Sequence, residues 1–429
     1  MSASYKRQML SDSIGFNSVI DPKFKTDTIN VRFILPISKE QSSGYALAAS
    51  LLTTSCRKYP SIASMSRKMN RMYGGSASVD VSKLGDFQII TASFSALCNR
   101  FAIDNEDIFG ELLDIVNCCL FDPNVTEKGF SENEFAIKSK DLLDTIEAEI
   151  NNKRCYAVRK CMNTAYKDEP CANLVYGTRE SVLKLTPQST FEAYKNMLRS
   201  AAVEIFFVSS EEQPTLADKF KEMFAKTDRK NAAVLPNFIT PSPLKAETAE
   251  VSETLPVAQC KMVMAFKTDC KDVQTMLLMN MLYGATPFSK LFTNVREKLS
   301  LCYYCSSTYS ETKQTMIVDC GVLKENIQTA KSEIINQLEA IAKGDFSDEL
   351  LDNSRMSAYN SIKTLGDTPS SYVRWYFTDL IRGVSRNVEE AVAAYKAVTR
   401  EQIMAAASSL KLDTVYILEA SCEEVQPNE

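Results

Sequence analysis

The sequence predicts an α+β fold composed of two similar halves, each an α/β sandwich. One order of elements occurs twice along the 429 residues: strand, helix, helix, hairpin, long helices, strand. Antiparallel strands followed by runs of helices are typical of α+β layers. Between the two occurrences, residues 236–256 contain four prolines and few residues to bury, which indicates a linker. We therefore expect domains at residues 1–235 and 257–429, each within the usual size range.

In the first half, β-rich or alternating apolar residues predict strands, and amphipathic or alanine-rich stretches predict helices. The expected strands are Asn30–Pro36, Ser76–Val81, Phe87–Phe94 and Glu204–Ser209, with a turn at Gly85–Asp86. The expected helices are Gly44 towards Pro60, Met65–Tyr73, Ile103–Leu120, Phe130–Ala165 with a break near Asn151–Asn152, and Thr190–Ser200.

The second half repeats this order. The expected strands are Lys261–Phe266, Cys302–Tyr309, Thr315–Gly321 and Val415–Glu419. The expected helices are Val273–Tyr283, Phe288–Lys298, Ile327–Ala342, Asp348–Thr364, Ser370–Ile381, Val388–Ala397 and Arg400–Leu410. The order of the two halves therefore predicts an internal duplication.

Composition excludes several classes of function. The net charge of −5, with basic and acidic residues well mixed, gives no electrostatic reason to expect binding to nucleic acid or to an acidic membrane. No apolar run approaches the length of a membrane span, and the N-terminal Met1–Leu10 has no signal-like apolar core. These features predict a soluble, cytoplasmic protein.

The chain contains no histidine, which excludes Ser-His-Asp and Cys-His catalysis within the chain and any zinc site built on imidazoles. The thirteen cysteines are an odd number, scattered through apolar segments, which predicts free thiols in a reducing cytosol. Cys302 and Cys305 match C-x-x-C, but residues three apart in a strand point to opposite faces. We therefore do not expect them to form a redox pair, and we expect Cys118 and Cys119 to serve packing.

The helix that begins at Gly44 carries small residues where a metallopeptidase needs ligands. Ala46 and Ser50 are four residues apart and share one helix face, and Ala49 lies close to the same face. In an inverted zincin these places hold His, Glu and His, which bind zinc and activate water. Ala46, Ala49 and Ser50 can neither bind a metal strongly nor accept a proton at neutral pH. The helix therefore predicts no metal, no cofactor and no catalytic residue.

The residues around this gap resemble the first signature block of the M16 (insulinase- and pitrilysin-like) peptidases. The resemblance rests on Gly44, the following leucines, Lys58-Tyr59-Pro60 and Met72-Tyr73-Gly74-Gly75-Ser76. Aligned through Gly44 instead of Pro60, the motif positions fall on Leu47, Ser50 and Leu51, which are equally inert. The position of the family's third ligand, a Glu, falls on Thr145 or Glu149. The resemblance implies two similar halves that form a clamshell around a substrate chamber.

A second block, Phe288–Phe292 and Val295–Tyr303, resembles the C-terminal signature of the same family. Arg296 and Tyr303 stand at the family's seven-residue spacing, and the resemblance implies that they hold the substrate backbone and stabilise the oxyanion. A guanidinium and a phenol suit that task, because both donate hydrogen bonds to a developing negative oxygen. The alternative is a surface arginine and a core tyrosine without a shared role.

The resemblance implies a non-catalytic subunit that pairs with a zinc-bearing M16 homologue as a heterodimer, with a peptide substrate in the chamber. It is similar to the short, metal-free member of a tandem gene pair of Gram-positive bacteria, some of which are associated with elongation factor P modification. The alternative is a peptide- or protein-binding module without proteolysis, alone or as a homodimer, in which a strand edge accepts an extended peptide. An enzyme of other chemistry is disfavoured because the candidate nucleophiles Ser50 and Cys56 lack a histidine base.

Overall fold

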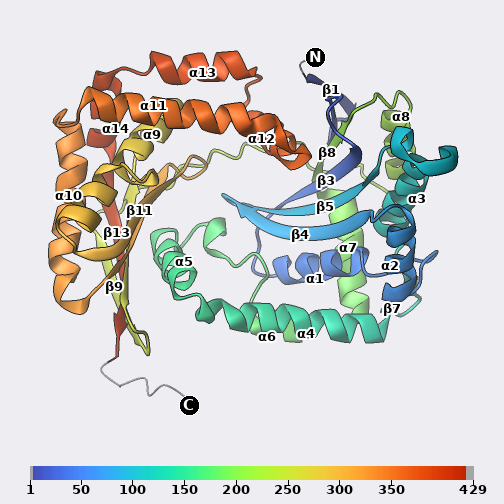
Figure 1. Cartoon of the computed structure of the whole chain (residues 1–429). Coiled ribbons are helices and arrows are strands. Elements are labelled where there is room, and N and C mark those ends of the chain that lie inside the picture. Colours follow the sequence, from blue (N-terminus) through green and yellow to red (C-terminus); the bar gives the residue numbers. More distant parts are fainter. Residues whose placement is uncertain (1–2, 422–429) are drawn as a thin grey trace. The chain divides into compact units, whose positions relative to one another are not determined.

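The computed structural model describes residues 3–421, which form two compact units (Figure 1). The first unit takes the chain up to Glu147, together with Asn173–Phe238 and Gly366–Thr378. The second unit takes Ala148–Ala172, Ile239–Leu365 and the chain from Asp379 onwards. None of the described helices is both long enough and apolar enough to cross a membrane.

The first unit contains a six-stranded sheet in the order β1-β2-β8-β3-β5-β4. Its strands are β1 (Ser4–Ser11), β2 (Ile14–Ile20), β3 (Thr26–Pro36), β4 (Ser76–Leu84), β5 (Phe87–Leu97) and β8 (Ala202–Ser209). The β2–β8 pair is parallel, and the other neighbouring pairs are antiparallel. Strands β3, β4, β5 and β8 were expected from the sequence, whereas β1 and β2 were not, because β1 is largely exposed and lacks an apolar alternation.

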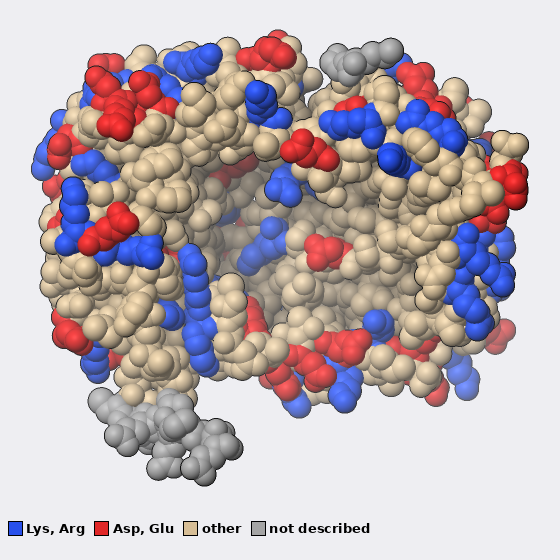
Figure 2. Space-filling model, in the orientation of Figure 1, with Lys and Arg blue, Asp and Glu red and all other residues tan. Residues whose placement is uncertain are grey.

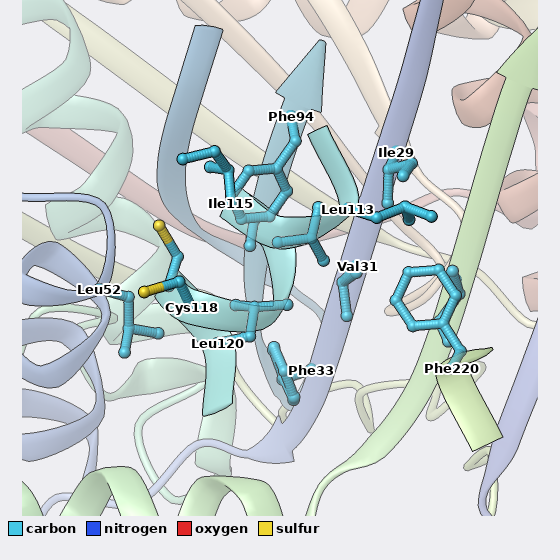
Figure 3. Packing of buried hydrophobic residues seen from close by; sticks show 14 of the residues in the cluster. Ile29, Val31, Phe33, Leu52, Phe94, Leu113, Ile115, Cys118, Leu120 and Phe220 are labelled. Carbon is cyan, nitrogen blue, oxygen red and sulfur yellow. The ribbon is translucent and has the colours of Figure 1, made fainter. Parts of the chain in front are cut away.

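The helices of this unit are α1 (Ser42–Leu52), α2 (Ile62–Arg71), α3 (Ile108–Phe121), α4 (Glu132–Ala148), α6 (Arg179–Leu183), α7 (Pro187–Ser200) and α8 (Leu216–Ala225). Gly74 adopts a φ of 74°, which lets the chain turn from α2 into β4. Alternate residues Ile29, Val31 and Phe33 of β3 point into the core that these helices cover (Figure 3).

The second unit contains a five-stranded sheet in the order β11-β12-β10-β13-β9. Its strands are β9 (Ala249–Leu255), β10 (Cys260–Lys267), β11 (Cys302–Ser310), β12 (Thr315–Val322) and β13 (Lys411–Ala420). Read from its β4 edge, the first sheet has the same order and directions over five strands, including one parallel pair at the same place. The expected duplication into two similar halves is therefore present in the topology.

The helices of the second unit are α5 (Lys153–Ala165), α9 (Val273–Asn280), α10 (Ile327–Ala342), α11 (Asp348–Lys363), α13 (Val388–Ala397) and α14 (Arg400–Ser409). Residues 281–285 and 291–298 form π-helical segments where the sequence predicted regular helix. Helix α12 (Pro369–Arg382) begins in the first unit and ends in the second.

The two units differ from the expected contiguous halves, residues 1–235 and 257–429, by two exchanged segments. Residues 148–172 pack α5 onto the second sheet, with Tyr156 and Cys161 against Val263 of β10. Residues 366–378 place Phe377 of α12 against Phe206 of the first sheet, with ring centroids 6.3 Å apart. Each sheet is thus covered on one face by helices of its own half and on the other by a helix from the other half. The expected linker 236–256 also contains strand β9.

The prediction that all cysteines are free thiols is wrong for one pair. Cys56, which follows α1, and Cys118 of α3 form a disulfide, with their Cα atoms 5.7 Å apart. Ten other cysteines of the described residues are free, and Cys422 lies outside them. The sequence contained no signal for this pairing, because the two cysteines are 62 positions apart in the chain and only the tertiary fold brings them together.

Candidate functional site

Helix α1 lies between the first sheet and α4 (Figure 1), and nearly all of it is buried. Ala46 and Ala49 are 2% and 0% exposed. Gly44 permits close packing against α7, because a Cβ atom there would lie 3.1 Å from the Cβ of Ala193. Ser50 is half-buried, and its hydroxyl donates to the carbonyl of Leu47 at 2.8 Å. The small residues of α1 therefore serve close packing.

Apolar side chains occupy the space around Ala46. Ala46 and Leu47 form a buried cluster with Leu142 of α4 and Val182 of α6. Partly buried neighbours complete this cluster: Val81, Phe135, Leu143, Ile146, Tyr176 and Leu185. An unpaired carboxylate or metal ion would lose its hydration here without compensation. In the other register of the motif, Leu47 and Leu51 are also buried, so both alignments lead to an apolar environment.

Neither candidate for the third ligand joins this cluster. Thr145 is exposed on α4, where its hydroxyl donates to the Asp141 carbonyl at 2.8 Å. Glu149 follows α4 and forms an ion pair with Arg159 at 2.5 Å. Among the described residues, no group of three side chains suited to holding a metal includes a residue of α1.

A cavity of about 610 Å³ lies beside the end of α1. Hydroxyl side chains line much of it, with Lys138 of α4 and two methionines of α2; the hydroxyl residues are Ser50, Thr53, Thr54, Ser66, Ser76 and Ser78. Of these residues, the sequence singled out Ser50, as a motif position, and Ser76, as the last residue of the Met72–Ser76 block. The others lacked a signal because exposed serines and threonines are common in turns and on strand surfaces.

Strand β4 forms the rim of this cavity and is an edge strand, paired within the described residues only with β5. The Tyr176 hydroxyl donates to the Val81 carbonyl at 3.2 Å, which shows that this carbonyl points away from β5. Because backbone direction alternates along a strand, the N–H and C=O groups of Ala77 and Val79 point the same way. The cavity therefore borders a row of backbone groups suited to pairing with an extended peptide.

Arg296 lies in the π-helical segment Leu291–Lys298 of the second unit. Buried Leu291 and Val295 anchor the segment, and the Arg296 guanidinium is exposed above the Phe292 ring, 4.5 Å from its centroid. The amide of Leu301 donates to the Val295 carbonyl at 3.1 Å, which returns the chain into β11. Wide helical turns of this type occur frequently at functional sites.

Tyr303 lies at the start of β11 and is 66% exposed. The register shifts between Cys302 and Tyr304, so that one extra residue stands opposite β12. This bulge turns both Cys302 and Cys305 into the core, which corrects the prediction that they point to opposite faces. A hydrogen bond with Cys305 and the charge of Arg296 lower the pKa of Cys302 against the effect of burial.

Basic and acidic side chains are interspersed on the molecular face shown in Figure 2. That face therefore offers no continuous field of one sign for a polyanion such as nucleic acid.

Comparisons with known proteins agree with this geometry. The family model described as the peptidase M16 inactive domain matches residues 184–357. The probable inactive metalloprotease YmfF of Bacillus subtilis is 25% identical over 424 residues, which cover 97% of this chain and 99% of that protein. A conserved protein of Enterococcus faecalis V583 has a similar crystal structure, with a TM-score of 0.89, 24% identity and coverage of 98% and 99% of the two chains.

The peptidase M16 inactive domain of Pseudomonas fluorescens is also similar in structure, with a TM-score of 0.80, 15% identity and coverage of 98% and 100%. At identities of 24% and 15%, these two structures show only that the fold is shared. The similarity in sequence to M16 peptidases rests on the match to the family model and on the two signature blocks. The chain is therefore similar over nearly its whole length to a protein named as a probable inactive metalloprotease, and residues 184–357 match the M16 inactive-domain model.

Proposed function

We propose that this protein is a non-catalytic M16 subunit that pairs with a zinc-bearing homologue and contributes Arg296 and Tyr303 to substrate binding. The observation that carries this proposal is the apolar packing around Ala46, which fills the place of the zinc ligands with Leu47, Leu142 and Val182. The absence of histidine from the sequence and the names of the relatives, which describe inactive proteins, support it.

The two sets of motif positions have opposite environments. The α1 positions are buried in an apolar cluster, whereas Arg296 and Tyr303 are exposed to solvent. The Tyr303 side chain is 66% exposed and covers no core of its own unit, so it is accessible to another molecule. The hydrogen-bond donors of a guanidinium and a phenol stabilise a transition state most when they lie where its negative charge develops.

Co-expression with an M16 homologue that carries the intact zinc motif tests the proposal. We expect peptidase activity only in the assembled pair, and a loss of about 10²-fold in kcat for Arg296→Ala or Tyr303→Phe. The matched control is Lys298→Ala, which removes a neighbouring exposed cation from the same segment and leaves activity unchanged. Size-exclusion chromatography confirms that each variant pair still assembles. Unchanged activity in both variants, or peptide hydrolysis by this chain alone, contradicts the proposal.

A second function is favoured by the β4 edge and its cavity: capture of an extended peptide without cleavage. Main-chain hydrogen bonds to Ala77 and Val79 give affinity in this mode, and the cavity of about 610 Å³ receives side chains. Fluorescence anisotropy of a labelled peptide with this chain alone measures it. N-methylation of the peptide backbone removes donors without altering the protein, so binding that survives full N-methylation excludes strand addition.

A further inference from the structure

A second cavity, of about 840 Å³, lies wholly within the second unit. Its wall consists of the segment that leads into α5 and the connection from β9 to β10; the lining residues are Asn151, Asn152, Lys153, Arg154, Pro256, Val257, Ala258, Gln259 and Lys261. These residues include three cations and no aspartate or glutamate. None of them belongs to the two M16 signature blocks described above.

The N-terminus of α5 opens onto this cavity. The Asn152 side chain caps the helix by accepting from the Cys155 amide at 3.1 Å. Lys153 and Arg154, whose amides precede the first intrahelical bond, are among the lining residues. The first turn of α5 carries no acidic residue, so the positive end of its dipole is not compensated within the helix.

Of the three cations of the lining, only Arg154 forms an ion pair within the described residues. Arg154 forms an ion pair with Asp319, with Nη2 and Oδ1 3.1 Å apart. Lys261 donates to the Oε1 of Gln259 at 2.7 Å, and within the described residues neither it nor Lys153 forms an ion pair. Burial lowers the pKa of Lys261, and the positive charge of Arg154 lowers it further. Two positive charges and a helix N-terminus therefore face the cavity without an anion.

Aromatic packing holds this arrangement in place. The Tyr304 ring of β11 contacts both cations, with the Arg154 guanidinium 4.3 Å and the Lys261 ammonium 5.6 Å from its centroid. Gly321 makes the packing possible, because a Cβ atom there would lie 2.6 Å from both the Tyr304 ring and the Gln259 amide oxygen. The Nε2 of Gln259 is buried and, among the described residues, donates to no acceptor. A buried donor without a partner costs free energy, which a rotation of this side chain towards an acceptor in the cavity would recover.

We propose that this cavity binds a compact oxyanion, a carboxylate or phosphate group. Charged donors, a helix N-terminus and an unsatisfied amide converge there, and these are the groups that bind such anions in proteins. The oxyanion is either the C-terminal carboxylate of a peptide or a free phosphate-type ion. The proposal does not depend on the Arg296–Tyr303 function, since the cavity contains neither residue.

Isothermal titration calorimetry of the full chain tests this with three probes: inorganic phosphate, a short peptide with a free C-terminal carboxylate, and the same peptide as its amide. We expect saturable binding of phosphate or of the free-acid peptide, weakened by salt. Binding of the acid but not the amide identifies a peptide end, and binding of phosphate alone identifies a free ion. Saturable binding of neither phosphate nor the free-acid peptide overturns the proposal.

The variants Lys261→Gln and Lys153→Gln each remove one cation of the lining. We expect each to weaken binding at least about tenfold, because a charge-assisted hydrogen bond is lost. Lys261→Arg keeps the charge and is expected to bind, which separates loss of the site from misfolding. The matched control is Lys343→Gln, an exposed cation paired with Glu339 in the same unit, which should bind as the wild type does. Equal binding by wild type and both glutamine variants assigns the anion to another place and overturns the proposal.

Discussion

Arg154 of α5 and Asp319 of β12 form an ion pair, with Nη2 and Oδ1 3.1 Å apart, although they are 165 positions apart in the chain. The Ser306 hydroxyl donates to the same carboxylate at 3.0 Å. The pair connects the segment 148–172 to the sheet of the second unit. The sequence had predicted this segment to belong to the first half.

Replacing Arg154 with Met should destabilise the protein. Asp319 is only 9% exposed in its side chain, and its carboxylate would lose its cationic partner. We expect a loss of about 1–3 kcal/mol, since Arg154 itself is half-exposed and the cost is below that of a fully buried pair. Urea unfolding measures it, and Arg179→Ala, whose pair with Glu147 is exposed on both sides, should cost less than about 1 kcal/mol. Equal losses for the two variants would show that the pair does not hold α5 in place.

Restoring the zinc motif in this chain should fail to create a zinc site. The triple change Ala46→His, Ala49→Glu and Ser50→His inserts two polar side chains into fully packed positions. We expect a loss of about 1–3 kcal/mol or more from overpacking and desolvation, and no stoichiometric zinc by elemental analysis. Ser50→His alone is the control, since Ser50 borders the cavity and the larger side chain has room. Stoichiometric zinc with unchanged stability would mean that the apolar cluster does not block the site.

Reduction should weaken the first unit through the Cys56–Cys118 disulfide. The bond closes a chain segment with a sequence separation of 62, and its loss restores conformational freedom to the unfolded state. We expect unfolding free energy to fall by about 2–4 kcal/mol on addition of a phosphine reductant. The double variant Cys56→Ala, Cys118→Ala should be insensitive to the reductant, while Cys119→Ala, a neighbour with a free thiol, keeps the wild-type response. A reductant effect that persists in the double variant would assign the response to other cysteines.

Asp413 should make stability depend on pH in the acid range. Its carboxylate is fully buried and accepts from the Lys245 ammonium at 2.7 Å, with Lys267 3.1 Å away. Burial opposes the charged form, but the hydrogen bonds from Lys245 and the charge of Lys267 outweigh it and lower the pKa of Asp413 below its usual value of 3.8. The stability from this group is therefore present above about pH 4 and is lost as pH falls through the lowered pKa.

In Asp413→Asn, two lysines would lose their anion, so we expect a loss of about 3–5 kcal/mol at neutral pH and a flatter decline below pH 4. Unfolding free energy measured from pH 7 to pH 3 gives both quantities. Asp348→Asn is the control, because that carboxylate is 89% exposed and should change neither. A decline in the Asn variant as steep as that of the wild type would assign the acid sensitivity to other carboxylates.

Local sequence pattern was sufficient to predict most helices and strands, because secondary structure depends mainly on residues close together in the chain. The alternation in β3, the small residues of α1 and the Gly74 turn each produced the element predicted, and the lack of histidine was enough to exclude a zinc site built on imidazoles. Strands β8 and β10 are almost continuously apolar, which predicts that both faces of each sheet are buried. The expected contiguous halves did not account for the second buried face.

The sequence by itself determined a duplicated α+β chain that resembles the M16 peptidases and whose motif helix lacks metal ligands. Only the tertiary structure decided which sheet α5 and α12 cover, that Cys56 meets Cys118, and that a bulge turns Cys302 and Cys305 to one face. The periodicity of apolar residues predicts which face of a helix or strand is buried. It does not predict the partner, because any apolar surface of matching shape can bury that face. The choice between partners is made by contacts across the whole fold, such as that of Arg154 with Asp319.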